Sequence, residues 1–177
     1  MKLVRFGLSV IKSFILKVKF GKRLELQKIN QDIRFTTEIK VGKEASMRIG
    51  RVSTRTNVHI VCVEGNMEIG KQVNINRNCI IICRYKISIG DNCSLGPNIC
   101  IYDHDHLFGK NGLVPNEYKC SEIIIESGCW IGAGAIILRG THIGKNSVIG
   151  AGTIVKGYVP PNSLVTSTRN NIISEIY

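Results

Sequence analysis

The sequence predicts an all-β chain wound as a parallel β-helix, and three observations lead to this fold class. Large aliphatic residues recur at intervals of six, and five small residues each lie four positions after one of them. Ile-Gly pairs recur at intervals of twenty before this ladder begins. The 177 residues include 18 glycines but only 11 aromatic residues, which is typical of many tight turns and small inward side chains.

The six-residue ladder is clearest in the second half of the chain. Its aliphatic members follow one another without a gap: Ile125, Ile131, Ile137, Ile143, Ile149 and Val155. Its small members are Cys129, Ala135, Thr141, Ser147 and Thr153. One such unit cannot bury its apolar face alone, whereas successive units can wind and stack. A spacing of six carries no helical period, and β-branched residues favour strands.

The earlier part of the repeat has a longer period. Ile49, Ile69 and Ile89 are each followed by glycine and are spaced by twenty. Three six-residue units make eighteen residues, so a period of twenty indicates a three-sided coil that contains a small bulge.

The N-terminal segment, residues 1–38, is basic and predicts an amphipathic helix. Residues 1–48 hold 12 Lys/Arg and 4 Asp/Glu, which is +8 of the total charge of +11. The apolar stripe consists of Val4, Leu8, Ile11, Ile15 and Val18, with Arg5, Lys12 and Lys19 along its border. Two interpretations stay open: residues 1–20 contact an anionic membrane surface, or the helix packs on its own domain or on a sister subunit. A nucleic-acid partner is not expected, because no recognised binding motif accompanies the charge.

The seven cysteines are odd in number and form no CxxC or Cys/His pair at zinc-ligand spacing. Reduced, packed thiols in a cytoplasmic chain without a required metal are therefore expected. Lys12, Lys17 and Lys19 interrupt the first apolar run, so neither a cleavable signal nor a spanning helix is expected. If the helix binds lipid, the protein would lie peripherally at the inner face of the membrane.

The repeat breaks once, and the break holds most of the chemistry. We expect a β-helix domain at 39–165, an inserted loop at 103–122 that begins with "DHDHLF", and a C-terminal tail at 166–177. A regular β-helix presents a smooth prism without a pocket, so a ligand site needs an excursion or a neighbouring subunit. Long ordered loops are often functional, which makes 103–122 the candidate.

Three tracts carry a resemblance to a known family: "IGDNCSLGPNICI", "IIIESGCWIGAGAIILRGTHIGKNSVIGAGTIV" and "VPPN". They resemble the hexapeptide-repeat acyltransferases, in particular the galactoside, maltose and capsular-sugar O-acetyltransferase branch. The likeness covers roughly residues 45–165. It implies a left-handed β-helix, a homotrimer with sites between subunits, and acetyl transfer from acetyl-coenzyme A to a sugar or glycan hydroxyl.

Such a transfer needs a base, because an alcohol is a weak nucleophile at neutral pH and imidazole titrates in the useful range. The register of the resemblance places the catalytic histidine on His106, with His104 as a competitor. Alternatively, both are loop residues paired with neighbouring aspartates. In a strand, the D-H-D-H alternation puts both histidines on one side, so an Asp–His pair would need a bent backbone or a sister subunit.

The candidate acceptor-binding residues are Asn78, Arg84 and Asp103. Asn78 by itself is typical of a turn, but the register of the resemblance makes it the active-site asparagine. Arg84 and Lys86 indicate an anionic or glycan-carrier acceptor. Asp103 or Asp105 would alternatively hold an imidazole N–H and select its tautomer.

The resemblance also implies a coenzyme A surface. Gly132, Ala133, Gly150 and Ala151 would allow the pantetheine arm to approach the backbone, and Lys156 would bind phosphate. The same residues are explained equally well as members of the repeat. Trp130 is expected in the core or in subunit packing.

Two functions from other classes remain. A γ-carbonic-anhydrase-like zinc site would use His59, His104 and His106, although the H-x-H pair lacks the H-x-x-x-x-H spacing of that group. A non-catalytic trimeric scaffold would need no site at all.

Overall fold

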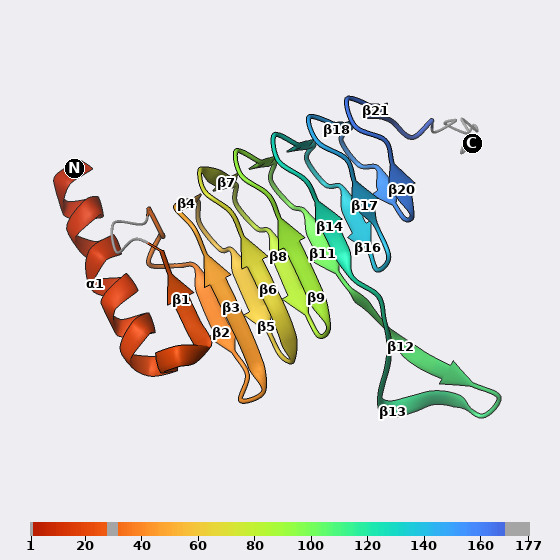
Figure 1. The fold of residues 1–177 in the computed structure, drawn as a ribbon, viewed down its shortest axis with the longest axis horizontal. Helices are drawn as coiled ribbons and strands as arrows, with labels where there is room; N and C mark the ends of the chain where they lie inside the picture. The colour runs from red at the N-terminus through yellow and green to blue at the C-terminus, as the bar shows by residue number, and fades with distance from the viewer. Residues whose placement is uncertain (1, 28–31, 169–177) are drawn as a thin grey trace, which may run out of the picture.

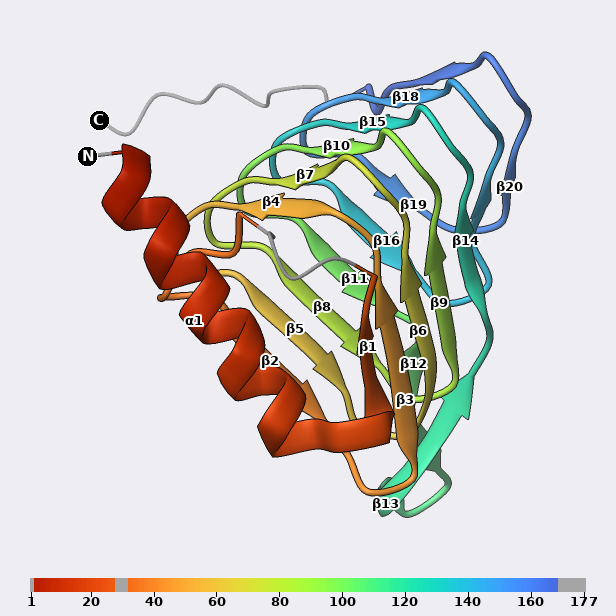
Figure 2. The same cartoon turned by 60° about the vertical axis from the view of Figure 1, so that its left-hand side comes forward.

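A computed structural model describes residues 2–27 and 32–168, and it shows a three-sided parallel β-helix. Figures 1 and 2 show coils stacked along one axis, with a helix across the N-terminal end. The predicted parallel β-helix with an N-terminal helix is therefore confirmed. Within the predicted tail, residues 169–177 lie outside the described residues.

Each side of the prism is one parallel sheet. The first sheet consists, in spatial order, of β1 (Leu24–Leu26), β3 (Ala45–Ile49), β6 (Gly65–Ile69), β9 (Lys86–Ile89), β14 (Ile123–Ile125), β17 (His142–Ile143) and β20 (Tyr158–Val159). The second consists of β4 (Val52–Thr54), β7 (Val73–Ile75), β10 (Ser94–Leu95), β15 (Trp130–Ile131), β18 (Val148–Ile149) and β21 (Leu164–Val165). The third consists of β2 (Glu38–Val41), β5 (His59–Cys62), β8 (Ile80–Cys83), β11 (Cys100–Tyr102), β16 (Ile136–Leu138) and β19 (Ile154–Val155).

The register between neighbouring strands shows the length of a coil. Met47 pairs with Met67, twenty residues later, in the early coils. In the late coils Ile131 pairs with Ile149, eighteen residues later. The predicted three-sided coil is confirmed, and the early coils are longer because their strands are longer, with five residues in β6 against two in β17 of the same sheet.

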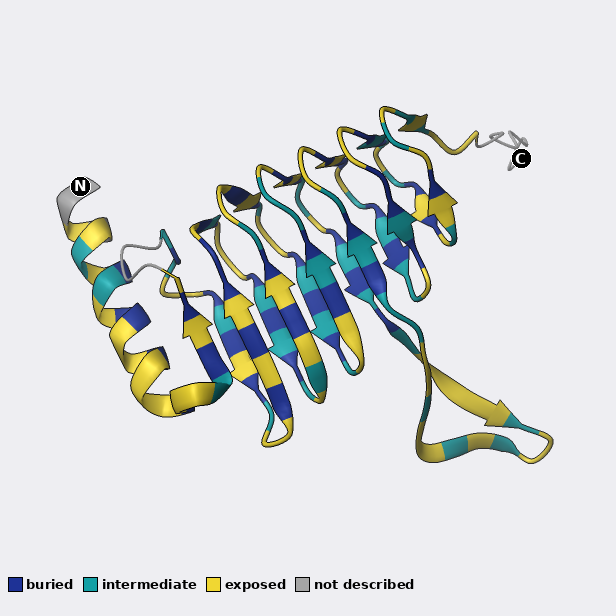
Figure 3. Ribbon diagram, in the orientation of Figure 1, coloured by how far each residue is buried: buried dark blue, intermediate teal, exposed yellow. Residues whose placement is uncertain are grey.

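The core lies inside the prism and contains the predicted ladder. All six aliphatic members from Ile125 to Val155 are buried, and so are the five small members that follow them. Figure 3 shows the resulting alternation of buried and exposed residues along each strand. All seven cysteines are free thiols, of which only Cys120 is exposed. The large and small inward residues thus fill successive layers of one continuous core.

Helix α1 (Lys2–Phe20) and the short 3-10 helix η1 (Gly21–Arg23) cover the first coil. Leu16 and Phe20 are buried against it. Lys12 is also buried, and its ammonium donates hydrogen bonds to the carbonyl oxygens of Arg34 (2.9 Å), Phe35 (2.7 Å) and Thr37. Of the three residues predicted along the border of the stripe, Lys12 therefore directs its charge towards the chain itself.

The first sheet begins earlier than the predicted boundary at residue 39. Strand β1 lies within the basic N-terminal segment and pairs with β3 from Leu24↔Met47 to Leu26↔Ile49. Within residues 2–27 and 32–168, no helix is long and apolar enough to cross a membrane.

The predicted excursion at 103–122 is an antiparallel hairpin that stands out from the prism (Figure 1). It consists of β12 (His104–Gly109) and β13 (Gly112–Cys120). The coils on either side of it stack directly on each other, since Ser94 pairs with Trp130 across the insertion. The hairpin therefore interrupts the sequence repeat without interrupting the sheets.

Candidate active site

Asp103 anchors the base of the hairpin. It is fully buried between β11 and β12, and its carboxylate accepts the backbone N–H groups of Arg84 (2.9 Å), Tyr85 (2.8 Å) and Lys86 (2.8 Å). Burial alone would raise the pKa of Asp103, but the hydrogen bond from His104 and the backbone donors outweigh it, so that its pKa is lowered. The carboxylate is thus held ionised inside the turn that joins β8 to β9.

His104 is oriented by this carboxylate. Its Nδ1 lies 2.9 Å from Oδ1 of Asp103, and a carboxylate can only accept, so Nδ1 carries the proton and Nε2 has a free lone pair. The ring also makes edge contacts with Tyr118 (5.6 Å between centroids) and Tyr102 (6.2 Å). The backbone bends between β11 and β12, which allows the Asp–His pairing that a straight strand would prevent.

His106 lies two residues further along β12 and is exposed. Its ring centroid is 4.8 Å from that of Tyr118, the residue paired with it on β13. Both histidines contact the same tyrosine, so they share one face of the hairpin, as the alternation predicts. Asp105 instead accepts a hydrogen bond from Nε of Arg139.

Two cations lie beside the histidines, and each has an acidic partner. Arg84 places its guanidinium 3.6 Å from the ring centroid of Tyr118, and its Nη1 lies 2.6 Å from Oε1 of Glu64. Lys86 pairs with Glu122 at 3.0 Å, and this hydrogen bond raises the pKa of Lys86. Arg84 and both histidines therefore contact the same ring, that of Tyr118.

Asn78 lies at a different corner of the prism. Its φ of 58° is left-handed, and its side chain joins an amide ladder with Asn57 and Asn98, at 3.1 Å to each. Strand β8 separates Asn78 from Arg84, a span of about 13 Å at 3.3 Å per residue. Within one chain, Asn78 is a turn residue that does not meet the histidines.

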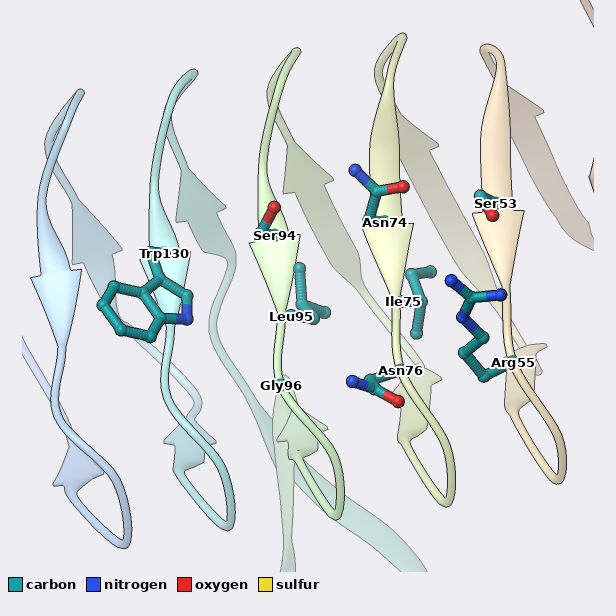
Figure 4. A pocket seen from close by; sticks show the side chains of 9 residues that line it. All are labelled: Ser53, Arg55, Asn74, Ile75, Asn76, Ser94, Leu95, Gly96 and Trp130. Carbon is teal, nitrogen blue, oxygen red and sulfur yellow. The ribbon is translucent and has the colours of Figure 1, made fainter.

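A groove on the second sheet reaches towards the corner of Asn78. Figure 4 shows Trp130 and Arg55 at its two ends, with Asn74 and Ser94 between them, around a cavity of about 280 Å³. Trp130 is 58% exposed, so of its two expected places the core is excluded, and packing between subunits stays a prediction. Sequence reasoning missed Arg55, Asn74 and Ser94, although Asn74 and Ser94 each precede a buried aliphatic residue and so face outward.

The five candidate coenzyme A residues lie on the last coils. Gly132 and Gly150 follow β15 and β18, and their N–H groups donate to Ile149 (2.7 Å) and Val165 (2.8 Å) of the next coil. A Cβ on Gly132 would lie 2.6 Å from the backbone nitrogen of Ala151. The close stacking of the coils therefore explains why residue 132 is a glycine, whether or not a cofactor binds there.

The other three members of this set are exposed. Ala133 and Ala151 follow the two glycines at successive turns of the same corner, and Lys156 follows β19. The small side chains of Ala133 and Ala151 leave an open backbone corner before the third sheet, whereas Lys156 lies at the far end of β19.

The structure does not group the three histidines of the zinc alternative. His59 lies on β5, where its Nδ1 is 2.9 Å from Glu38 and its Nε2 is 3.1 Å from Asn57. Among the residues that the structure describes, no three His, Cys, Asp or Glu side chains are grouped to hold a metal ion. His59 therefore does not join His104 and His106, and the zinc alternative has no ligand set.

Comparisons with known proteins agree with this geometry. Residues 122–156 match the model of the hexapeptide repeat of succinyl-transferase. This part of the chain carries the hexapeptide repeat. Its hexapeptide coils are similar in sequence to galactoside O-acetyltransferases, as the quoted tracts predict. The match to the Escherichia coli protein is 36% identical over 115 residues, covering 63% of this chain and 55% of that protein.

A second galactoside O-acetyltransferase matches to a similar extent. The galactoside O-acetyltransferase of Lactococcus lactis is 33% identical over 103 residues, covering 58% of this chain and 50% of that protein. The chain thus spans about half the length of the curated relatives it matches.

Solved structures share the hexapeptide fold over most of the chain. A hexapeptide-repeat containing acetyltransferase from Vibrio cholerae, complexed with acetyl-coenzyme A, superposes with a TM-score of 0.58 at 22% identity, covering 98% of this chain and 86% of that one. An N-acyltransferase from Bacillus cereus, in complex with dTDP-4-amino-4,6-dideoxyglucose and coenzyme A, gives 0.59 at 20% identity, covering 85% and 82%. At these identities the likeness concerns the fold.

Proposed function

We propose that this protein is an acetyl-coenzyme A-dependent O-acetyltransferase that acts on a sugar or glycan hydroxyl. The observation that carries the proposal is the pair of histidines on one face of a hairpin, at the single place where a hexapeptide prism departs from its repeat. The similarity to galactoside O-acetyltransferases supports the reaction class. The reaction forms an ester bond to the acceptor oxygen, breaks the thioester and releases coenzyme A with a free thiol.

The base is assigned to His106, with His104 as the second candidate. His106 is exposed and lies in the register that the resemblance implies, so an acceptor hydroxyl can reach it. A specific observation favours His104: its Nδ1–H is fixed on Asp103, which leaves Nε2 to accept a proton. In either case Asp103 acts through the hairpin and positions the imidazoles, because its buried carboxylate has no surface for an acceptor.

The coenzyme A surface is assigned to the corner formed by Gly132, Ala133, Gly150 and Ala151, with Lys156 for a phosphate. The exposed alanines leave backbone that an extended pantetheine arm can follow. The Vibrio cholerae acetyltransferase of similar fold, which is complexed with acetyl-coenzyme A, supports the assignment of a coenzyme A surface to these coils. The chemistry assigned to the chain needs no metal.

A homotrimer would unite the parts of the site that one chain keeps apart. Asn78 and the Trp130 groove lie across the third sheet from the hairpin, so a neighbouring subunit must bring a histidine to them. The outer face of the third sheet supports such packing, because it is apolar over several coils. Its half-buried outward residues are Val61, Ile80, Ile82, Cys100, Tyr102, Ile136 and Leu138.

The function is tested by the release of coenzyme A thiol from acetyl-coenzyme A. The acceptors are simple sugars, nucleotide sugars and lipid-linked glycans, and mass spectrometry locates the new acetyl group. Acetyl transfer to a sugar oxygen that is lost on His104→Ala/His106→Ala supports the proposal. Transfer to amino groups only, or no binding of acetyl-coenzyme A in calorimetry, contradicts it. Light scattering that shows a monomer at micromolar concentration contradicts the trimer.

A further inference from the structure

Helix α1 carries two opposite faces, and within residues 2–27 and 32–168 only one of them is buried. The inner face packs on the first coil through Ser9, Lys12, Ser13, Leu16 and Phe20, all of them buried. Ser9 accepts the N–H of Ile33 at 2.8 Å, and the Lys12 ammonium sits among three carbonyl oxygens. These contacts determine which side of the helix points away from the prism.

The outer face is the predicted apolar stripe, and the structure leaves all of it exposed. Val4 and Val18 are 67% and 70% exposed. The other exposed apolar members of this face are Leu8, Ile11, Phe14 and Ile15. At 100° per residue, these six side chains occupy an arc of roughly 120°. This arc is wider than the narrow seam of a two-stranded coiled coil, and it suits a flat apolar surface.

The apolar surface continues beyond the helix. A cavity of about 520 Å³ opens beside Val4 and Leu8, and Phe35, which is 64% exposed, lines its other side. Arg34 lines the same cavity and adds a cation at its edge. The outer face of α1, the side chain of Phe35 and this cavity together form what we term the end surface.

The charges that helix α1 brings to the end surface have one sign. The helix contains no acidic residue, and Lys17, Lys19 and Lys22 are exposed at its C-terminal part. A second copy of the helix would bring lysines close to lysines, which is unfavourable. An anionic surface would be attracted by the same charges.

We propose that the end surface binds the face of an anionic phospholipid bilayer, with α1 lying in the plane of the interface. The helix is about 28 Å long at 1.5 Å per residue, and its inner face stays on the prism, so that only the outer side chains enter the lipid. Because α1 covers the N-terminal end of the stack (Figures 1 and 2), this end of the prism would contact the bilayer. The hairpin, which leaves the prism several coils away from α1, would not lie in the contact. This inference does not depend on the reaction that the protein catalyses.

Flotation of the full chain with vesicles tests the proposal. The expected result is binding to mixed phosphatidylcholine and phosphatidylserine vesicles, weaker binding at high salt and little binding to phosphatidylcholine alone. Ile11→Glu/Ile15→Glu should reduce the partition coefficient by at least about 100-fold, because two aliphatic side chains that would enter the lipid are replaced by charged ones. Lys17→Gln/Lys19→Gln should reduce it about 25-fold, at roughly fivefold per charge.

A matched variant at the other end of the prism serves as the control. Leu164 is also an exposed apolar residue, on the last strand, so Leu164→Glu should leave vesicle binding unchanged. The orientation is read from Phe14→Trp in a Trp130→Phe background, whose emission should shift to the blue on binding. The same reporter placed by Leu164→Trp should not shift.

Three outcomes would overturn the proposal. One is a wild-type chain that does not float with either kind of vesicle. Another is equal flotation of the wild type and of Ile11→Glu/Ile15→Glu with the vesicles, when circular dichroism shows that both proteins are folded. The third is loss of oligomer mass in the same variant without any vesicle binding of the wild type, which would assign the end surface to a second copy.

Discussion

Asp103 and His104 are neighbours in the chain and are also hydrogen-bonded through their side chains, with 2.9 Å between Oδ1 and Nδ1. The same carboxylate binds three backbone N–H groups of the turn that follows β8. One buried charge therefore ties the hairpin to the prism and selects the tautomer of an imidazole. A change of this carboxylate should affect both folding and catalysis.

Substitution of the histidines should separate the two candidate bases. His106→Ala should lower kcat about 10² to 10⁴-fold, the usual contribution of a positioned base, while the affinity for coenzyme A barely changes. His104→Ala should have the smaller effect. The measurement is steady-state kinetics of the wild type and of both variants, with acetyl-coenzyme A and the acceptor varied in turn. If His104→Ala abolishes turnover while His106→Ala does not, the base is His104.

Replacement of Asp103 should make the free energy of unfolding less dependent on pH in the acidic range. The pKa of Asp103 is lowered in the folded chain, so its ionised form contributes stability above its usual pKa of about 3.9, and this is lost as the pH falls through the folded value. Asp103→Asn should reduce the free energy of unfolding by roughly 2 to 4 kcal/mol at pH 7, because charged hydrogen bonds are lost. Urea denaturation at pH 7 and pH 3 should show the difference from wild type shrinking in acid. An unchanged difference would mean that Asp103 does not titrate with folding.

Gly132 should be required by the stacking of the coils even without a cofactor. Gly132→Ala places a Cβ 2.6 Å from the backbone of Ala151, and relief of this overlap should lower the free energy of unfolding by about 1 to 3 kcal/mol. The matched control is Gly7→Ala in α1, where a Cβ meets nothing within 4 Å and helix propensity should add up to about 1 kcal/mol. Thermal unfolding without coenzyme A measures both. Equal melting temperatures for Gly132→Ala and wild type would contradict the stacking explanation.

Asn78 can be tested apart from its role in the turn. Glycine accepts its φ of 58°, so Asn78→Gly should retain the fold and remove only the amide. Asn98→Gly is the matched control, since Asn98 has a φ of 60° in the same ladder. If Asn78 serves the active site, only Asn78→Gly should lower kcat, by about 10² to 10³-fold. Equal kinetics in both variants would make Asn78 a turn residue only.

The prism could be predicted from the sequence because its packing is local. Each inward residue contacts the same layer in the next coil, so a period of six or twenty along the chain repeats the geometry in space. The tie between Asp103 and the Arg84 turn could not be predicted in this way. It joins residues nineteen positions apart through a bend that follows no period. The burial of Lys12 was missed for a similar reason, since its carbonyl partners belong to residues 34–37, outside the helix pattern.

The direct pairing of Ser94 with Trp130 allows the hairpin between them to vary in sequence without a change in the coils. The backbone enters and leaves the hairpin at adjacent points, where the N–H of Ser121 donates to the oxygen of Asp103 at 2.9 Å. A hairpin of another length or composition can therefore replace residues 104–120 without altering the register of any coil. The coils thus form a fixed frame and the hairpin an insert that can be exchanged. Under the proposed function, grafting hairpins between related prisms should change the acceptor specificity.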